Sequence, residues 1–202
     1  VSVYIWSVYT ECLHGMPSKC PIRVAVPVNL RPYFNSITTK NFFVMVSAEF
    51  HPTKETYTFA EVAAIVKESL RSQINRENLE KLFSYNVSNE KLLIARVVPL
   101  FLKNLAMKYV YTTSALANTA TITNIGNISV TEEYRPYVEM FHAFLAMSKG
   151  QHLKGTICSY GDTLVFSFSY DLVDASVQRG FFRKIASDGI AVEIKSNGVN
   201  YE

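Results

Sequence analysis

The chain has 202 residues, of which 49% are hydrophobic and 13% aromatic, a composition that is typical of a globular protein and argues against disorder. The formal net charge of +3 comes from 20 basic and 17 acidic residues. These charges are scattered rather than gathered in a basic block, so the sequence gives no support to nucleic-acid binding.

The first predicted element is a helix over residues 2–12, where apolar residues recur at helical spacing. Gly15 and Pro17 end it. The run before them is apolar from Val1 onward and has no basic segment in front of it, which argues against a signal peptide. Because native N-termini more often begin with polar, frayed residues, we expect Val1 to lie inside a longer protein.

Two strands are predicted next, at residues 22–30 and 41–50. The first is rich in β-branched residues, and its Pro27 indicates an edge or an irregularity. A polar turn around Asn35 and Ser36 separates the two. The second run is apolar throughout, which is typical of a strand covered on both faces.

The middle of the chain predicts helices. Thr58 has the position of an N-cap, and Glu61 three residues later completes a capping box, so a helix is expected from there to about Phe83. A second helical region is predicted at 92–111, with Pro99 in the first turn of its main part.

The stretch from 92 to 117 is the most apolar long segment of the chain. It holds Arg96, Lys103 and Lys108, and a central Lys or Arg costs a membrane-spanning helix about 2.5–3.5 kcal/mol. No transmembrane segment is therefore predicted, and we expect a buried or interfacial helix.

The last third of the chain predicts mainly strands, at 119–124, 137–147, 153–160, 163–170 and 190–194. The first of them is expected to stop at Gly126. Gly161-Asp162 predicts a hairpin turn. A helix capped by Asp174 and ended by Gly189 precedes the final strand.

Together these elements predict an α/β fold: a two-layer sandwich with a mixed β-sheet and helices mainly on one face. No linker, repeat or low-complexity segment divides the chain, so residues 1–202 are expected to form a single domain.

Motifs for common chemistries are missing. His14, His51, His142 and His152 lack metal-binding spacing, and the sequence has no G-x-S-x-G, P-loop or G-x-G-x-x-G. Cys12, Cys20 and Cys158 are odd in number and have no C-x-x-C spacing, which argues against a disulfide framework and a zinc site. We expect no metal, no covalently bound cofactor and a reducing, cytoplasmic location.

Two segments stand out from this background. One is the strand ending Val26-Pro-Val-Asn29-Leu-Arg31, followed by Asn41-Phe-Phe; the other is Thr123-Asn124-Ile-Gly126. Arg31 either caps the strand into solvent or holds another element through a carboxylate pair. Asn41 is either an ordinary strand start or part of the same feature, and Asn124 is either a turn residue or a polar corner facing a ligand channel.

In the order and spacing of these motifs, and in the Pro-Tyr-Phe loop between them, the chain resembles the second half of acyltransferases of the chloramphenicol acetyltransferase and condensation-domain superfamily. The resemblance spans nearly the whole chain. It is strongest to bacterial alcohol acetyltransferases, whose second half has a V-N-L-R, an N-F-F and a T-N-x-G or S-N-x-G, followed by a terminal hairpin and helix.

The resemblance implies one of two similar α/β halves around a tunnel. The histidine of an H-x-x-x-D-G motif in the first half acts as general base on an alcohol or amine, which attacks an acyl thioester of coenzyme A or a carrier protein. This sequence has no H-x-x-x-D-G. The implied identity is therefore a C-terminal half, inactive alone, whose main partner is the missing N-terminal half.

The resemblance also implies roles for particular residues. Thr123, Asn124 and Gly126 become candidates for the substrate channel. Asn29, Arg31 and Asn41 become structural or interdomain residues, and Arg31 is expected to pair with the aspartate of the H-x-x-x-D-G motif. Without that half, Arg31 should be solvent-exposed or paired with a local acid.

Two alternatives stay open: a noncatalytic interaction domain that keeps the same half-fold, and part of a peptide-synthetase condensation or epimerisation module. For a separated half we expect an exposed apolar face that drives self-association, because soluble monomers rarely expose large apolar patches.

Overall fold

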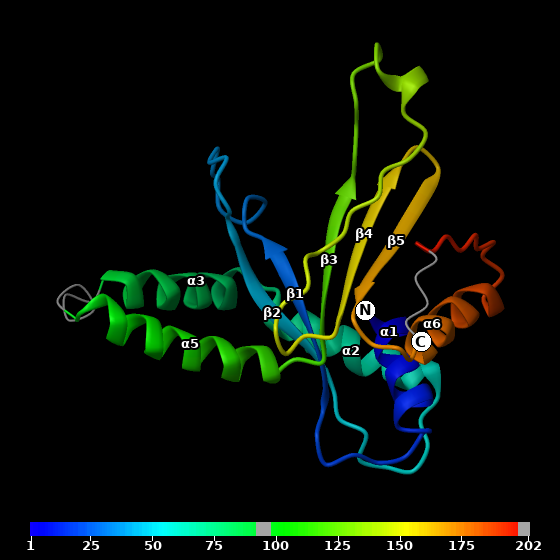
Figure 1. Ribbon diagram of the computed structural model, residues 1–202, viewed down its shortest axis with the longest axis horizontal. Coiled ribbons are helices and arrows are strands. Elements are labelled where there is room, and N and C mark those ends of the chain that lie inside the picture. Colours follow the sequence, from blue (N-terminus) through cyan, green and yellow to red (C-terminus); the bar gives the residue numbers. More distant parts are fainter. Residues whose placement is uncertain (92–97, 198–202) are drawn as a thin grey trace.

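The computed structural model describes residues 1–91 and 98–197 and shows the α/β architecture that the sequence predicts. Five strands form one open sheet in the order β2-β1-β3-β4-β5 (Figure 1). Their bounds are β1 Ile22–Asn29, β2 Phe43–Phe50, β3 Ala120–Asn127, β4 Leu153–Tyr160 and β5 Thr163–Tyr170. Strands β1, β3 and β4 run parallel, and β2 and β5 are antiparallel edge strands.

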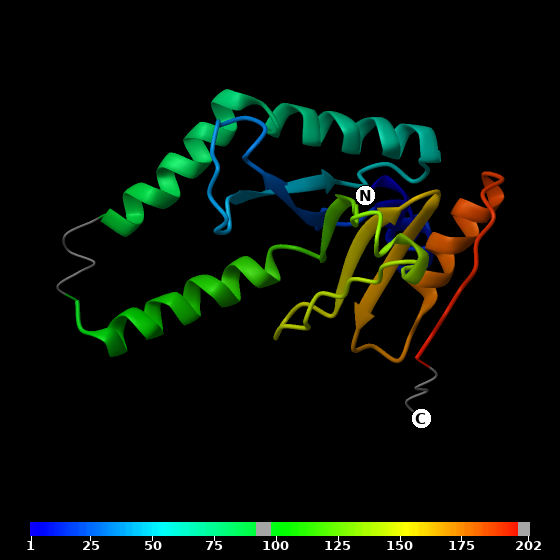
Figure 2. The same ribbon diagram turned by 90° about the horizontal axis from the view of Figure 1, so that it is seen from above.

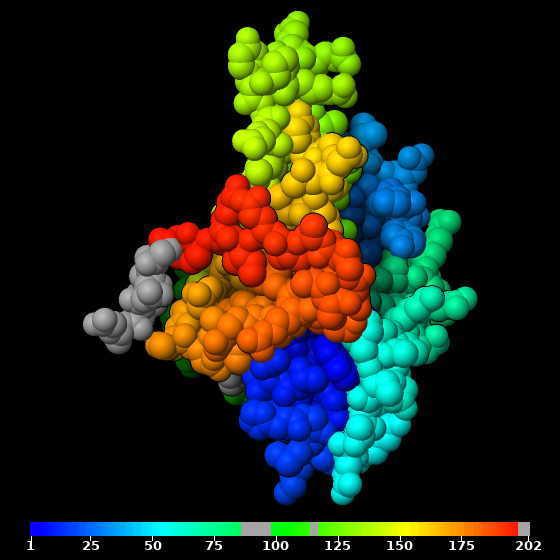
Figure 3. All heavy atoms as spheres, turned by 90° about the vertical axis from the view of Figure 1, so that its right-hand side faces the viewer, coloured from blue at the N-terminus to red at the C-terminus, as the bar shows by residue number. Residues whose placement is uncertain are grey.

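The helices are α1 Ser2–Ser7, which continues as the π-helical turn η1 Val8–Cys12, α2 Phe59–Gln73, α3 Arg76–Lys91, α5 Leu100–Leu116 and α6 Ser176–Ser187. Helices α1, α2 and α6 share one core with the sheet and cover one of its faces. Figure 3 shows α6 beside α1. Helices α3 and α5 form an arm that extends away from the sheet (Figures 1 and 2).

The centre of the core is aromatic. Tyr9 of η1 lies edge-on to Phe50 of β2 and to Tyr57, with ring centroids 5.6 and 5.9 Å apart, and its hydroxyl donates to the Gly15 carbonyl. Phe50 and Tyr57 are 5.0 Å apart. Edge-to-face rings add to the gain from burial, so this cluster fixes the first helix against β2.

Helix α2 begins as the sequence predicts. The Glu61 backbone N–H donates to Thr58 Oγ1 (3.3 Å), and the Thr58 backbone N–H donates to a Glu61 carboxylate oxygen (2.7 Å). Each side chain thus satisfies a backbone donor that a helix start leaves unpaired, and the capping box is confirmed.

The capping box makes the unfolding free energy of the chain depend on pH. The Lys54 ammonium and then the Thr58 donors lower the pKa of Glu61 from 4.5 to about 2. A lowered carboxyl pKa stabilises the fold above pH 4.5, and this contribution is lost as the pH falls toward about 2. We expect the difference in unfolding free energy between the wild type and Glu61→Gln to shrink over that range in urea titrations. The exposed Glu68→Gln in the same helix is the control, and a pH-independent difference would contradict the assignment.

The long helix predicted from Thr58 to about Phe83 is two helices. Helix α2 ends at Gln73, and Ile74 leaves the helical conformation. The side-chain oxygen of Asn75 then accepts the Asn78 backbone N–H (2.9 Å), which starts α3 in the manner of an N-cap. Helix α5 begins one residue after Pro99, close to the prediction, while residues 92–97 of that predicted helix lie outside the described residues.

The expectation that residues 41–50 are covered on both faces is wrong. Val44, Val46, Ala48 and Phe50 are buried, but Phe43 and Met45 are 47% and 45% exposed. Strand β2 is an edge strand, and α1, α2 and α6 cover only the opposite face of the sheet here. An apolar run therefore did not mean burial on both sides.

The strand predicted at 137–147 is also wrong. A 3₁₀ turn, η2 (Arg135–Tyr137), is followed by an extended segment without ladder pairing. This segment lies over the face of β4 that the helices leave free: Cys158 Sγ contacts the Phe141 carbonyl (3.2 Å), and Lys154 Nζ donates to the Ala146 carbonyl (2.7 Å). Half-buried and exposed residues alternate from Phe141 to Met147, as in an extended chain that lies across a sheet.

The end of the chain mixes confirmed and wrong predictions. The β4–β5 hairpin turns at Gly161, whose φ is +56°, and Gly189 (φ +85°) ends α6, both as predicted. Asp174 accepts the Ser176 backbone N–H (2.9 Å) at the start of α6. The strand predicted at 190–194 is wrong, because this segment has no ladder pairing.

Candidate functional site

The topology brings the six residues singled out in the sequence to one end of the sheet. Asn29 ends β1 and Arg31 follows it, while Thr123–Gly126 occupies the carboxyl-terminal half of β3. Because β1 and β3 are parallel, their carboxyl ends lie at the same end of the sheet. Strand β2 runs antiparallel to β1, so Asn41, just before the start of β2, lies at this same end of the sheet.

Strands β1 and β3 part as they approach that end of the sheet. Their pairing is limited to Val24 with Ala120 and Ala25 with Thr121, and the strands diverge beyond it (Figure 1). Pro27 lies just past this pairing, where its missing N–H breaks no ladder with β3. The irregularity predicted at Pro27 is confirmed.

Arg31 holds the loop between β1 and β2. Its Nε and Nη2 donate to the Thr38 carbonyl (3.1 and 3.0 Å), and Nη2 also donates to the Lys40 carbonyl (2.7 Å). Its Nη1 donates to Asn29 Oδ1 (3.3 Å), which also accepts the Arg31 backbone N–H. The expectation that Arg31 is solvent-exposed or paired with an acid is wrong: it is half-buried, and backbone carbonyls and an amide take its donors.

This clamp predicts a stability effect. Arg31→Ala removes charged donors from two carbonyls and an amide, and we expect it to lower the unfolding free energy by about 1–3 kcal/mol. Lysine should restore only part of this, because it lacks the planar fork. Urea denaturation measures both variants, with Arg71→Ala, an exposed arginine in the last turn of α2, as the control. Equal losses at Arg31 and Arg71 would mean that the clamp contributes nothing.

Asn124 uses its side chain locally. Its Oδ1 accepts the Gly126 backbone N–H (2.9 Å), and Gly126 has φ +88°. The ladder to β4 shifts register between these two residues, which leaves Ile125 bulged and 54% exposed, and β3 continues past Gly126 to Asn127. Asn124 therefore shapes a bulge. Thr123 is paired in register with Thr156 of β4.

No protein-family model matches the chain. The curated proteins that were searched contain no match either.

Among the described residues, His152 is the histidine that lies beside a carboxylate. His152 Nδ1 is 3.0 Å from Asp171 Oδ1, but both side chains are at least half exposed. His152 precedes β4 and Asp171 follows β5, so this pair lies at the end of the sheet opposite to Thr123–Gly126. Within residues 1–91 and 98–197, no group of three His, Cys, Asp or Glu side chains is placed to hold a metal ion.

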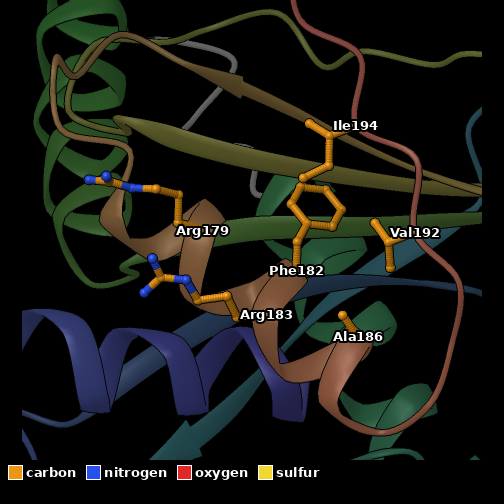
Figure 4. Close-up of a pocket in the computed structure, with 6 residues that line it drawn as sticks. All are labelled: Arg179, Phe182, Arg183, Ala186, Val192 and Ile194. Carbon is orange, nitrogen blue, oxygen red and sulfur yellow. The ribbon is translucent and has the colours of Figure 1, made fainter.

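A shallow hollow of about 280 Å³ opens between α6 and the extended segment that follows it (Figure 4). It is lined by Arg179, Phe182, Arg183, Ala186, Val192 and Ile194. The two arginine head groups point away from Val192 and Ile194, and Arg179 lies 3.8 Å from Asp174. None of the six sequence-predicted residues lines this hollow.

Helix α5 was expected to be buried or interfacial. No described part of the chain buries it, because its apolar side chains between Leu100 and Tyr111 are exposed, and the structure does not test the interfacial alternative. The exposed ones are Leu100, Phe101, Leu102, Leu105, Met107, Tyr109, Val110 and Tyr111. A helix that is apolar all round is normally buried. No helix in the described part of the chain is long and apolar enough to cross a membrane.

Proposed function

We propose that this chain is the C-terminal half of an acyltransferase of the chloramphenicol acetyltransferase and condensation-domain superfamily. The assembled enzyme would move an acyl group from a coenzyme A or carrier-protein thioester to an alcohol or amine. The motifs that carry the resemblance support this, because Arg31, Asn41 and Thr123–Gly126 lie at one end of the sheet, where β1 and β3 part.

The observation that carries the proposal is the unpartnered apolar surface. Leu105 and Tyr109 of α5 are 66% and 71% exposed, and Phe43 and Met45 add to the uncovered face of β2. Exposed apolar side chains gathered along one helix in this way indicate an interaction site. In the proposal the catalytic half covers it and supplies the H-x-x-x-D-G histidine.

The charge of this surface indicates what it binds. Residues 98–131 contain no Asp or Glu, and their charged residues are Lys103 and Lys108. An apolar groove with an acidic rim is complementary to such a helix. We therefore expect acidic residues on the catalytic half beside α5.

Within the proposal, Arg31 acts by holding a loop. The resemblance pairs it with the aspartate of H-x-x-x-D-G, but its donors are engaged by Thr38, Lys40 and Asn29. Arg31 thus fixes the 31–42 loop at the edge where the two halves would meet. Arg31→Ala in the assembled enzyme should then lower activity and stability together.

A thioester-release assay tests the proposal with acetyl-coenzyme A and a simple alcohol. The isolated chain should release no thiol above background. A general base usually contributes about 10²–10⁴-fold, so the assembled protein should be faster by at least that factor. Turnover by the isolated chain would contradict the proposal. A tight complex that never releases thiol would favour the noncatalytic interaction domain.

A further inference from the structure

The two edge strands of the sheet, β2 and β5, differ in the hydrogen bonds that their outer backbone groups make. At the β2 edge, Gln73 of α2 donates from Nε2 to the Ser47 carbonyl (2.8 Å) and accepts the Ser47 backbone N–H (3.2 Å). Ser69 of the same helix accepts the Glu49 backbone N–H (3.1 Å). Side chains of α2 thus occupy the place of a neighbouring strand at Ser47 and Glu49.

Among the residues that the structure describes, the β5 edge has no such hydrogen bonds from a helix, and the backbone of β5 bonds only to β4, in a ladder that runs from Leu153–Tyr170 to Tyr160–Thr163. The Asp171 N–H donates to the His152 carbonyl (3.4 Å), so Asp171 and every second residue before it in β5 direct their backbone groups toward β4. The backbone groups of alternate residues therefore face away from β4, namely those of Leu164, Phe166, Phe168 and Tyr170.

The composition of β5 offers no protection against pairing. Thr163–Tyr170 reads Thr-Leu-Val-Phe-Ser-Phe-Ser-Tyr, with no charge, proline or glycine. Natural proteins usually block a free edge with such residues, a bulge or a covering element. Leu164 and Tyr170, near the two ends of the strand, are 69% and 41% exposed. The edge thus has the features of a strand that pairs with another.

We propose that β5 pairs antiparallel with β5 of a second copy of this chain, across a two-fold axis at Ser167. In this register Phe166 faces Phe168 of the second copy, and Leu164 faces its Tyr170. Every outward N–H and C=O from Leu164 to Tyr170 gains a partner, and the exposed ends of the strand are covered.

A second copy is the occupant that the composition favours. Opposite residues in an antiparallel pair point to the same face, so this register keeps both sets of helices on one side of a continuous sheet. It places aromatic rings opposite each other, an arrangement that stabilises strand pairs, and brings no charges together. The β5 edge lies away from the α3–α5 arm (Figure 1), so this pairing does not depend on the proposed acyltransferase function.

Charge substitutions test this register. Leu164→Lys with Tyr170→Lys places like charges opposite each other in both symmetric pairs, whereas Leu164→Lys with Tyr170→Glu places opposite charges there. By light scattering across a concentration series, we expect a dimer for the wild type. Its dissociation constant should rise roughly tenfold or more in the first variant and return to within about threefold in the second.

Met45→Lys, on the uncovered face of β2, is the control for association through apolar surface. It should leave the β5-dependent dimer in place. A wild type that stays monomeric, or a dimer that Met45→Lys disrupts and the β5 lysines do not, would overturn the proposal. Equal weakening by both β5 variants would overturn the register. Circular dichroism of each variant confirms that the chain is folded.

Discussion

If this chain is the C-terminal half proposed above, glutamate at both Leu105 and Tyr109 of α5 is expected to weaken its binding to the catalytic half by about 10²–10³-fold. The two side chains lie one helical turn apart, and both are mostly exposed. If the catalytic half covers them, each substitution buries a negative charge in an apolar contact, beside the acidic residues that we expect there. Binding measured by calorimetry and thiol release by the assembled enzyme should fall together, while the melting temperature of the isolated chain should not.

The matched control is Ala60→Glu with Ala64→Glu on α2. These positions are exposed, have the same spacing and belong to the helix layer that packs on the other face of the sheet. They should change neither binding nor activity. If the α5 and α2 variants bind equally well, α5 is not the docking helix.

Phe50→Ala is expected to lower the unfolding free energy of the chain by about 3–5 kcal/mol. Phe50 is fully buried, and its ring lies edge-on to Tyr9 and Tyr57. Truncation leaves a cavity between η1 and β2 that the surrounding rings cannot fill without leaving their contacts. Urea denaturation measures the change.

Phe43→Ala provides the comparison within the same strand. Phe43 is 47% exposed on the uncovered face of β2, so its truncation should cost under about 1 kcal/mol. Similar losses at Phe50 and Phe43 would mean that the two faces of β2 are buried alike, contrary to the structure.

Local signals in the sequence predicted local structure well. The capping box at Thr58 and Glu61, the hairpin at Gly161 and the end of α6 at Gly189 each depend on a few neighbouring residues. Their geometry is decided by backbone hydrogen bonds within one turn. The start of α3 at Asn75 had the same kind of signal, since a capping residue interrupts the helical pattern there.

Packing partners were not predictable in the same way. The apolar run at 137–147 suggested a strand, but such a run cannot tell a strand in a ladder from an extended segment lying across a sheet. That choice depends on Lys154 and Cys158, which lie in β4 and contact the carbonyls of Ala146 and Phe141. For helix α5 the expectation was a buried or an interfacial helix, and its apolar composition alone could not decide between the two; no described part of this chain buries it.

For the candidate site, too, the placement of the residues could be predicted and the contacts of their side chains could not. The expected α/β order with a mixed sheet places Asn29, Arg31, Asn41 and Thr123–Gly126 at one end. The bonding of Arg31 could not be predicted, because its acceptors are backbone carbonyls of the 31–42 loop and the sequence does not specify the path of that loop. The order of the elements thus determines which residues share this end of the sheet, whereas the contacts of their side chains depend on the path of the loop.

The most direct test of the proposed half-enzyme is a titration of this chain into the polypeptide that carries the H-x-x-x-D-G motif, with thiol release from acetyl-coenzyme A as the readout. We expect activity to rise from background and to saturate when the two halves are present in equal amounts, while the chain alone releases nothing. Thiol release by the chain alone at the rate of the assembled protein, or no increase at any ratio, would contradict the proposal.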